Sequence, residues 1–112
     1  MKFAALVKKI LKREGRSGTI DVSVVDDQTI HALNKRFRKK DKPTDVLSFT
    51  LNETGFLGDV IISEETTRKN AKRYGVAYEE EFKRLVIHGV LHVIGYDHGK
   101  KMRDAEAVYS QF

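Results

Sequence analysis

One stretch decides how this chain folds, Ile87-His88-Gly89-Val90-Leu91-His92-Val93-Ile94-Gly95-Tyr96-Asp97-His98. The chain has four histidines in 112 residues, and three of them fall in this stretch. His88 and His92 have the spacing that places two imidazoles on one face of a helix, one turn apart. His98 cannot join them on the same helix, because at about 100° per residue it would point about 240° round from His92. The spacing therefore predicts a helix that ends between His92 and His98.

Gly95 is the residue that can end this helix, because glycine adopts the left-handed conformation of a helix cap at little steric cost. The two residues after it would lead the chain back and bring His98 to His88 and His92. Three neutral nitrogen ligands leave a fourth coordination position open, which is typical of catalytic rather than structural zinc. Two other interpretations stay open: three unrelated histidines, and a structural metal site completed by Asp97 or another carboxylate.

The same spacing occurs in the long zinc-peptidase motif, H-E-x-x-H-x-x-G-x-x-H, with a difference at its second position. The peptidases carry there the glutamate that acts as general base, whereas this chain has Gly89. The ligand pattern is kept while the catalytic carboxylate is missing. This favours a metal hydrolase other than an ordinary protease, and a metallopeptidase-like hydrolase remains as an alternative.

Composition predicts one globular domain, residues 1–112, with 40% hydrophobic and 33% charged residues. The chain has no cysteine, so any metal must be held by nitrogen and oxygen ligands. No apolar run reaches membrane-spanning length and no signal-peptide core is present, so we expect a cytoplasmic protein. The net charge of +5 favours a polyanionic partner over a cationic one.

Apolar periodicity around the histidine stretch predicts further helices and strands. Helices are expected over 2–14, from a cap at Asp26 or Asp27 through Phe37, over Glu64–Tyr74 between Ser63 and Gly75, from Glu79 through the histidine pair, and over Met102–Gln111. Strands are expected over Thr19–Val25, Val46–Leu51 and Phe56–Ile62, the last as a central strand. The fold class is therefore α+β: a small mixed sheet packed with helices, in which the metal-binding helix is followed by a loop that carries the third histidine.

Three expectations concern residues whose surroundings are ambiguous in the sequence. In the last helix we expect Ala105, Val108 and Tyr109 to pack inward. Met102 is expected to be a plain core methionine, and a place beneath the metal is its alternative. His31 is expected to be exposed or locally bonded, with duty as a fourth ligand as its alternative.

The most basic stretch of the chain lies between a predicted helix and a predicted strand, and it reads Arg36-Phe37-Arg38-Lys39-Lys40-Asp41-Lys42-Pro43-Thr44-Asp45. It holds the only proline, and a residue before proline is pushed out of helical conformation, so we expect an extended loop. Lys39, Lys40 and Lys42 can attract the backbone of a polyanion. Phe37 or Tyr96 could stack on an unpaired base.

Two stretches together resemble one family, the YbeY-type bacterial endoribonucleases, which are ribosomal RNA maturation factors. The histidine stretch is similar to the family signature H-G-x-L-H-x-x-G-Y-D-H. A second similarity covers Leu33-Asn34 through Phe37-Arg38-Lys39-Lys40-Asp41-Lys42-Pro43-Thr44-Asp45-Val46-Leu47-Ser48-Phe49, followed by Leu57-Gly58-Asp59. The resemblance extends from about Val24 to Glu106. The family usually has a further strand before its first helix, so the resemblance leaves the size of the sheet open.

The resemblance implies a zinc-dependent endoribonuclease that prefers single strands and acts in small-subunit ribosomal RNA 3′-end maturation and ribosome quality control, in the cytoplasm. It implies that His88, His92 and His98 bind one Zn²⁺ ion, a site that other divalent transition metals also fit. It implies RNA and the small ribosomal subunit as partners, and neither a membrane nor DNA is expected. A non-catalytic ribosome-assembly factor with a structural metal is the remaining alternative.

The resemblance also implies that Arg38 is a catalytic residue near the metal. A guanidinium is always charged and presents a planar fork of donors, so it suits the negative charge that develops on a phosphodiester during cleavage. From composition alone, a surface ion pair would be the simpler interpretation of this arginine.

Overall fold

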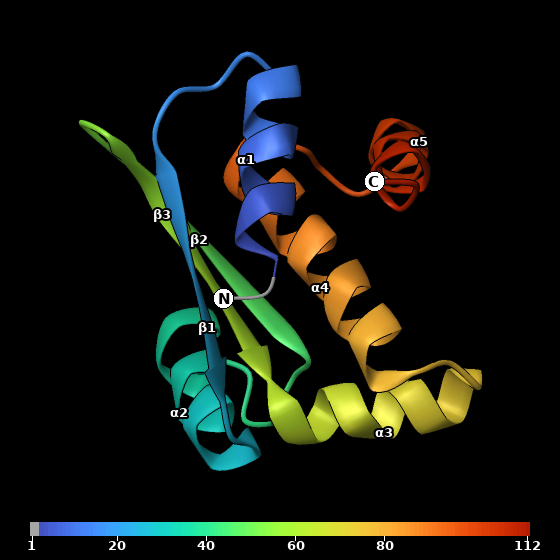
Figure 1. The fold of residues 1–112 in the computed structure, drawn as a ribbon. Helices are drawn as coiled ribbons and strands as arrows, with labels where there is room; N and C mark the ends of the chain where they lie inside the picture. Colours follow the sequence, from blue (N-terminus) through green and yellow to red (C-terminus); the bar gives the residue numbers. More distant parts are fainter. Residues whose placement is uncertain (1–2) are drawn as a thin grey trace.

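Helices and strands follow the expected order in a computed structural model, which describes residues 3–112 (Figure 1). The helices are α1 (Ala4–Arg13), α2 (Asp27–Arg38), α3 (Glu64–Tyr74), α4 (Tyr78–Val93) and α5 (Lys100–Tyr109). The strands are β1 (Thr19–Val25), β2 (Val46–Glu53) and β3 (Phe56–Ser63). The α+β class is confirmed, and no helix in the described range is long and apolar enough to cross a membrane.

The central strand of the sheet is β3, as its apolar sequence predicts. The described strands lie in the order β1-β3-β2, with β1 parallel and β2 antiparallel to β3. Val60 of β3 is paired with Val22 on one side and with Ser48 on the other, and it is fully buried. The sheet is therefore mixed, as expected, and β2 forms one of its edges.

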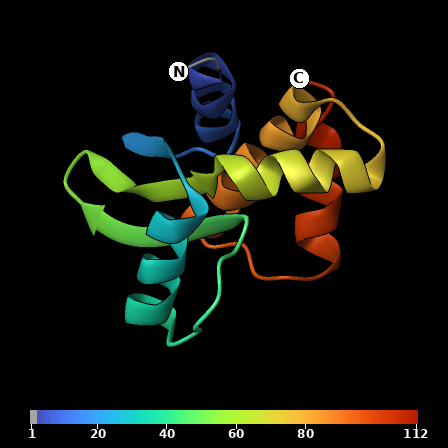
Figure 2. The same ribbon diagram turned by 90° about the horizontal axis from the view of Figure 1, so that it is seen from below.

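The two faces of β2 are covered by different helices. Side chains alternate between the faces of a strand. On one face, the hydroxyls of Ser48 and Thr50 donate to backbone carbonyls of α4, that of Ser48 to Gly89 O at 3.1 Å and that of Thr50 to Val93 O at 3.0 Å. On the other face, the ring of Phe49 contacts α2. Figure 2 shows α1 and α2 projecting to opposite sides of the strands. The edge strand β2 thus lies between α2 and α4.

Two glycines let α4 approach the sheet closely. A Cβ atom on Gly89 would lie 2.5 Å from Val60 Cγ1, and a Cβ atom on Gly58 would lie 2.0 Å from Phe49 O and 3.0 Å from Val93 Cγ1. The motif position that holds glutamate in the zinc peptidases is therefore pressed against β3. A side chain of any size at that position would clash with Val60.

Most helix ends lie where the capping residues predict. Asp26 is the cap of α2, because its carboxylate accepts the Thr29 amide at 2.8 Å. Ser63 caps α3, which ends at Gly75 in the left-handed conformation. The helix expected over 2–14 is α1, which begins at Ala4, and residue 2 lies outside the described residues. Two further starts differ from the prediction: α4 begins at Tyr78 rather than Glu79, and α5 begins at Lys100, two residues before Met102. Neither helix has a side-chain cap, so the sequence carries no signal for its first residue.

The hydrophobic core joins α1, β3, α4 and α5. Met102 and Tyr109 are buried in it, and Ala105 packs against it. Val108 is 41% exposed, so the expectation that it packs inward is wrong. The buried positions of α5 are spaced by three and four residues, and Val108 lies about 100° from Tyr109, outside that stripe.

Candidate metal centre

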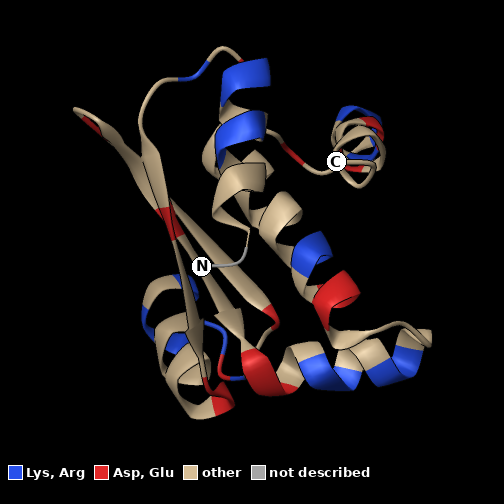
Figure 3. Ribbon diagram, in the orientation of Figure 1, with Lys and Arg blue, Asp and Glu red and all other residues tan. Residues whose placement is uncertain are grey.

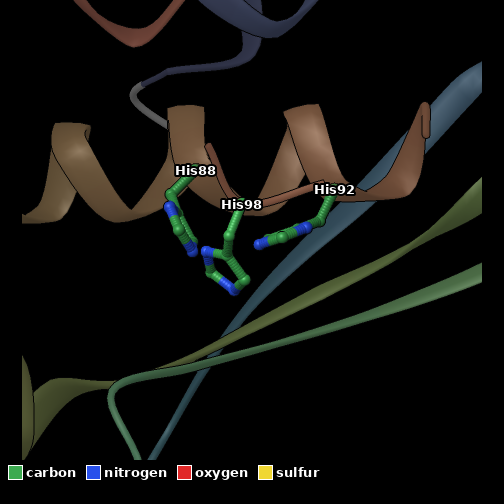
Figure 4. Close-up of side chains that lie close together, drawn as sticks. All are labelled: His88, His92 and His98. Atoms are coloured by element: carbon green, nitrogen blue, oxygen red, sulfur yellow. The ribbon is translucent and has the colours of Figure 1, made fainter. Parts of the chain in front are cut away.

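The three imidazoles predicted to converge do so in the structure (Figure 4). His88 and His92 stand one turn apart on α4, and their ring centroids are 4.6 Å apart. The ring of His98 lies 5.6 Å from that of His88 and 4.6 Å from that of His92. One nitrogen from each ring lies within 4.8 Å of the other two. Within residues 3–112, this convergent group contains neither Asp97 nor His31.

The end of α4 brings His98 back to the pair. Gly95 has a φ of +107°, a backbone conformation that glycine adopts more easily than other residues. The amide of Gly95 donates to His92 O at 3.1 Å, and that of Tyr96 donates to Leu91 O at 2.9 Å. The Tyr96 hydroxyl donates to a carboxylate oxygen of Glu14 at 2.8 Å and so ties the turn to α1. The helix thus ends where the spacing predicts.

Hydrogen bonds fix the orientation of the two helical rings. Nδ1 of His92 donates to Tyr96 O at 2.9 Å, because a carbonyl can only accept. Nδ1 of His88 lies 3.1 Å from a carboxylate oxygen of Glu106 on α5. In both rings this leaves Nε2 as the nitrogen free to bind a metal ion. A carboxylate or carbonyl behind a ligating histidine is the usual arrangement around protein-bound zinc.

The donor set fits a divalent transition metal. Burial and the neighbouring His88 lower the pKa of His92, so this ring is neutral at neutral pH, the form in which imidazole binds metal. Three nitrogen donors and no sulfur suit Zn²⁺, and they also suit nickel, copper or cobalt. The geometry therefore supports a metal site without selecting the ion.

A cavity of about 610 Å³ opens beside the three rings. The residues that line the cavity come from α2, from β2 and the loop before it, and from α4 and the loop after it. They are Phe37, Arg38, Thr44, Asp45, Val46, Ser48, Phe49, His88, His92 and His98. Arg38 from the end of α2 therefore faces the same space as the histidines of α4. The structure brings together residues that lie 50 positions apart in the sequence, Arg38 and His88.

The three lysines predicted to contact RNA lie outside this lining. Lys39, Lys40 and Lys42 are exposed on the loop that follows α2. The loop is held to the helix by Asn34, which is buried and donates from Nδ2 to Lys42 O at 2.9 Å, while its own carbonyl accepts the Lys40 amide at 3.2 Å. The basic side chains therefore project from an anchored loop next to the cavity.

One wall of the cavity is held by a polar network that the sequence did not reveal. The Asp45 carboxylate accepts from Asn70 Nδ2 at 3.2 Å and lies 3.9 Å from Arg84 Nη2. Arg84 in turn donates through two nitrogens to Glu81, at 2.8 and 2.7 Å, and Glu81 is 2% exposed. Arg84 stands one turn before His88 on α4. The network therefore links the loop wall to the helix that carries the histidine pair.

The structure also shows the surroundings of other residues near the site. His31 Nε2 lies 2.7 Å from a carboxylate oxygen of Asp41, which agrees with the expected local bond. The sequence does not identify Glu106 or Asn34 as site residues, because spacing alone does not show which segment each side chain contacts. Phe37 lies on α2 seven residues after the buried Ile30, yet it is 55% exposed and lines the cavity.

The chain matches the family model described as Endoribonuclease YbeY over residues 1–111. A curated relative of that name from Aquifex aeolicus is 53% identical over 85 residues, which cover 72% of this chain and 57% of that protein. Another of the same name, from Persephonella marina, is 42% identical over 111 residues, which cover 93% of this chain and 72% of that protein. The chain thus spans a little over half of the first relative's length and less than three quarters of the second's.

A solved structure has a similar fold. The solution structure of TM1509 from Thermotoga maritima superposes with a TM-score of 0.74 at 32% sequence identity. The match covers 98% of this chain and 77% of the Thermotoga chain.

Proposed function

The chain belongs to the endoribonuclease YbeY family, and from this premise we propose that it is a metal-dependent endoribonuclease whose active site is the cavity beside the three histidines. The observation that carries the proposal is the meeting of three imidazoles and an arginine in one cavity, from elements far apart in the chain. The substrate is RNA. The biological target we propose is the 3′ end of small-subunit ribosomal RNA, together with ribosome quality control, in the cytoplasm.

We assign the metal-binding role to His88, His92 and His98, with Zn²⁺ as the ion. Zinc held by three neutral ligands supplies a Lewis acid and lowers the pKa of water to about 7. The chain itself supplies the orientation of the rings: Glu106 and the Tyr96 carbonyl hold two of them with Nε2 free. In this arrangement the protein needs no glutamate at position 89.

We assign the catalytic role to Arg38. Its guanidinium lines the cavity, and within residues 3–112 no carboxylate forms an ion pair with it. This argues against the surface ion pair that composition alone suggested. A free, charged fork of donors in the cavity can bind the non-bridging oxygens of a phosphodiester and stabilise the charge that develops there.

The close approach of α4 to the sheet argues against the peptidase alternative. A glutamate at position 89 would need space that Val60 and Ser48 occupy, since even a Cβ atom would lie 2.5 Å from Val60 Cγ1. The cavity also carries an arginine, which suits a phosphodiester better than a peptide bond.

The test compares metal content, melting temperature and cleavage of a structured ribosomal RNA fragment. Arg38→Ala should keep the metal and the melting temperature of the parent but lose cleavage by at least about a hundredfold, the effect of removing an electrostatic stabiliser. His92→Ala should lose both metal and cleavage. Arg73→Ala serves as the matched control, because Arg73 is exposed on α3 and does not line the cavity.

Two results would overturn the proposal. Cleavage by Arg38→Ala at the parental rate would remove the role of the arginine. A parent that cleaves no RNA, and whose only response to chelation is a lower melting temperature, would favour the non-catalytic assembly factor with a structural metal.

A further inference from the structure

Phe37 is an exposed aromatic side chain in the wall of the active-site cavity. It is 55% exposed, although Ile30 of the same helix is fully buried. A single exposed apolar ring is common on protein surfaces, so it is the position of Phe37 in the cavity wall, rather than its exposure, that points to a ligand. The position is next to Arg38, and both residues line the cavity.

The ring of Phe37 is held in place by its neighbours. Its centroid lies 5.5 Å from that of Phe49 at an interplanar angle of 70°, an edge-on contact that supports the ring from the side of β2. The guanidinium carbon of Arg36 lies 5.2 Å from the ring centroid. An aromatic ring and a planar cation are the two kinds of group on which unpaired nucleobases stack in proteins. Phe37 and Arg36 thus place both kinds of group side by side, and Phe37 is the one that lines the cavity.

The other aromatic residue considered for stacking has a different role. Tyr96 donates its hydroxyl to Glu14 at 2.8 Å and packs against the core. It does not line the cavity that holds Arg38. Of the two candidates, only Phe37 lines the cavity that holds Arg38 and the three histidines together.

We infer that Phe37 forms a subsite for one unpaired nucleobase next to the scissile phosphate, an inference that rests on the proposed RNA cleavage. Because Phe37 and Arg38 line the same cavity, a nucleotide whose phosphate contacts Arg38 can place its base against the ring of Phe37. A base in a duplex cannot reach the ring without leaving its own stack, so the subsite favours single strands. Stacking uses the face of the base and therefore tolerates any of the four bases.

The test is an abasic scan of a short single-stranded RNA whose cleavage site has been mapped, with the full chain loaded with Zn²⁺. For the parent, removing the base at one position beside the cleaved bond should raise KM by about tenfold or more, the usual size of a stacking contact, with a smaller change in kcat. Phe37→Leu should raise KM on intact RNA by a similar factor and should be insensitive to the abasic position. Phe37→Trp should restore both the low KM and the sensitivity.

The controls separate stacking from folding and from the proposed function itself. Phe37→Leu should keep the metal content and melting temperature of the parent. Tyr74→Leu, which removes an aromatic ring that is 56% exposed and lies outside this cavity, should keep the parental KM. If the parent cleaves RNA but shows no sensitive abasic position, or if the Leu variant retains that sensitivity, the base subsite is wrong and the endoribonuclease proposal stands. If the parent cleaves no RNA, both fall.

Discussion

Glu106 is the residue whose contribution to the site is least visible in the sequence and most directly testable. Its carboxylate lies 3.1 Å from His88 Nδ1, behind the ring that we assign to the metal. Such partners orient the ring and strengthen the ligand, and their loss typically lowers metal affinity about 10- to 100-fold. We expect a loss in this range for Glu106→Ala, measured by competition with a chelator of known affinity.

The control for this prediction is Asp104→Ala on the same helix. The Asp104 carboxylate pairs with Lys100 at 2.8 Å on an exposed surface, so its removal should leave the affinity unchanged. Equal affinities of the parent and Glu106→Ala would show that packing on α4, rather than this carboxylate, orients His88.

At the scale of elements, the contact between α4 and β3 depends on the absence of a side chain at position 89. Gly89→Ala would place a methyl group 2.5 Å from Val60 Cγ1, and overpacking of this kind costs about 1–3 kcal/mol. Val60→Ala alone should also destabilise, because Val60 is fully buried and its truncation leaves a cavity. The double variant should be less destabilised than the sum of the two, as measured by urea denaturation. Strictly additive costs would mean that the helix moves away from the sheet instead of clashing with it.

The elements differ in how well the sequence predicts them, for local reasons. The bounds of α3 follow from Ser63 and Gly75, because a capping hydroxyl and a left-handed glycine act within one turn. The convergence of the histidines also follows from local spacing and from Gly95. The start of α4 does not, since Ala77 offers no capping side chain.

The parts of the site that the sequence left open depend on contacts between distant segments. Phe37 has the helical spacing of an apolar residue relative to Ile30, yet it is 55% exposed and lines the cavity. Asp45 and Glu106 look like ordinary surface carboxylates. They become site residues through Asn70 and His88, which lie 25 and 18 positions away along the chain. No periodicity encodes such a pairing.

At the scale of the whole molecule, the basic residues behind the net charge of +5 lie on several elements, and those of the loop after α2 are next to the cavity. Figure 3 shows Lys and Arg on α1, on α3 and around the end of α2. Each phosphate neutralised on a single strand contributes about −0.7 to the slope of log K against log salt. Changing Lys39, Lys40 and Lys42 together to Ala should weaken RNA binding and reduce the steepness of this slope by up to about 2.

The matched control removes the same charge from α3, with Lys69, Lys72 and Arg73 changed to Ala. These residues are exposed and lie outside the cavity lining, so the slope should stay close to that of the parent. If both triple variants flatten the slope equally, RNA responds to overall charge and the loop after α2 has no special part in binding.

The placement of the site residues along the chain also has a consequence in time. The three imidazoles come from one short segment, whereas Arg38 and Phe37 belong to a helix formed some fifty residues earlier in synthesis. On the roles proposed above, a growing polypeptide exposes the residues for phosphate and base well before the residues for the metal ion have been made. A nuclease arranged in this order cannot cut the RNA of the ribosome that is making it until the histidine segment has emerged and packed beside the earlier helix.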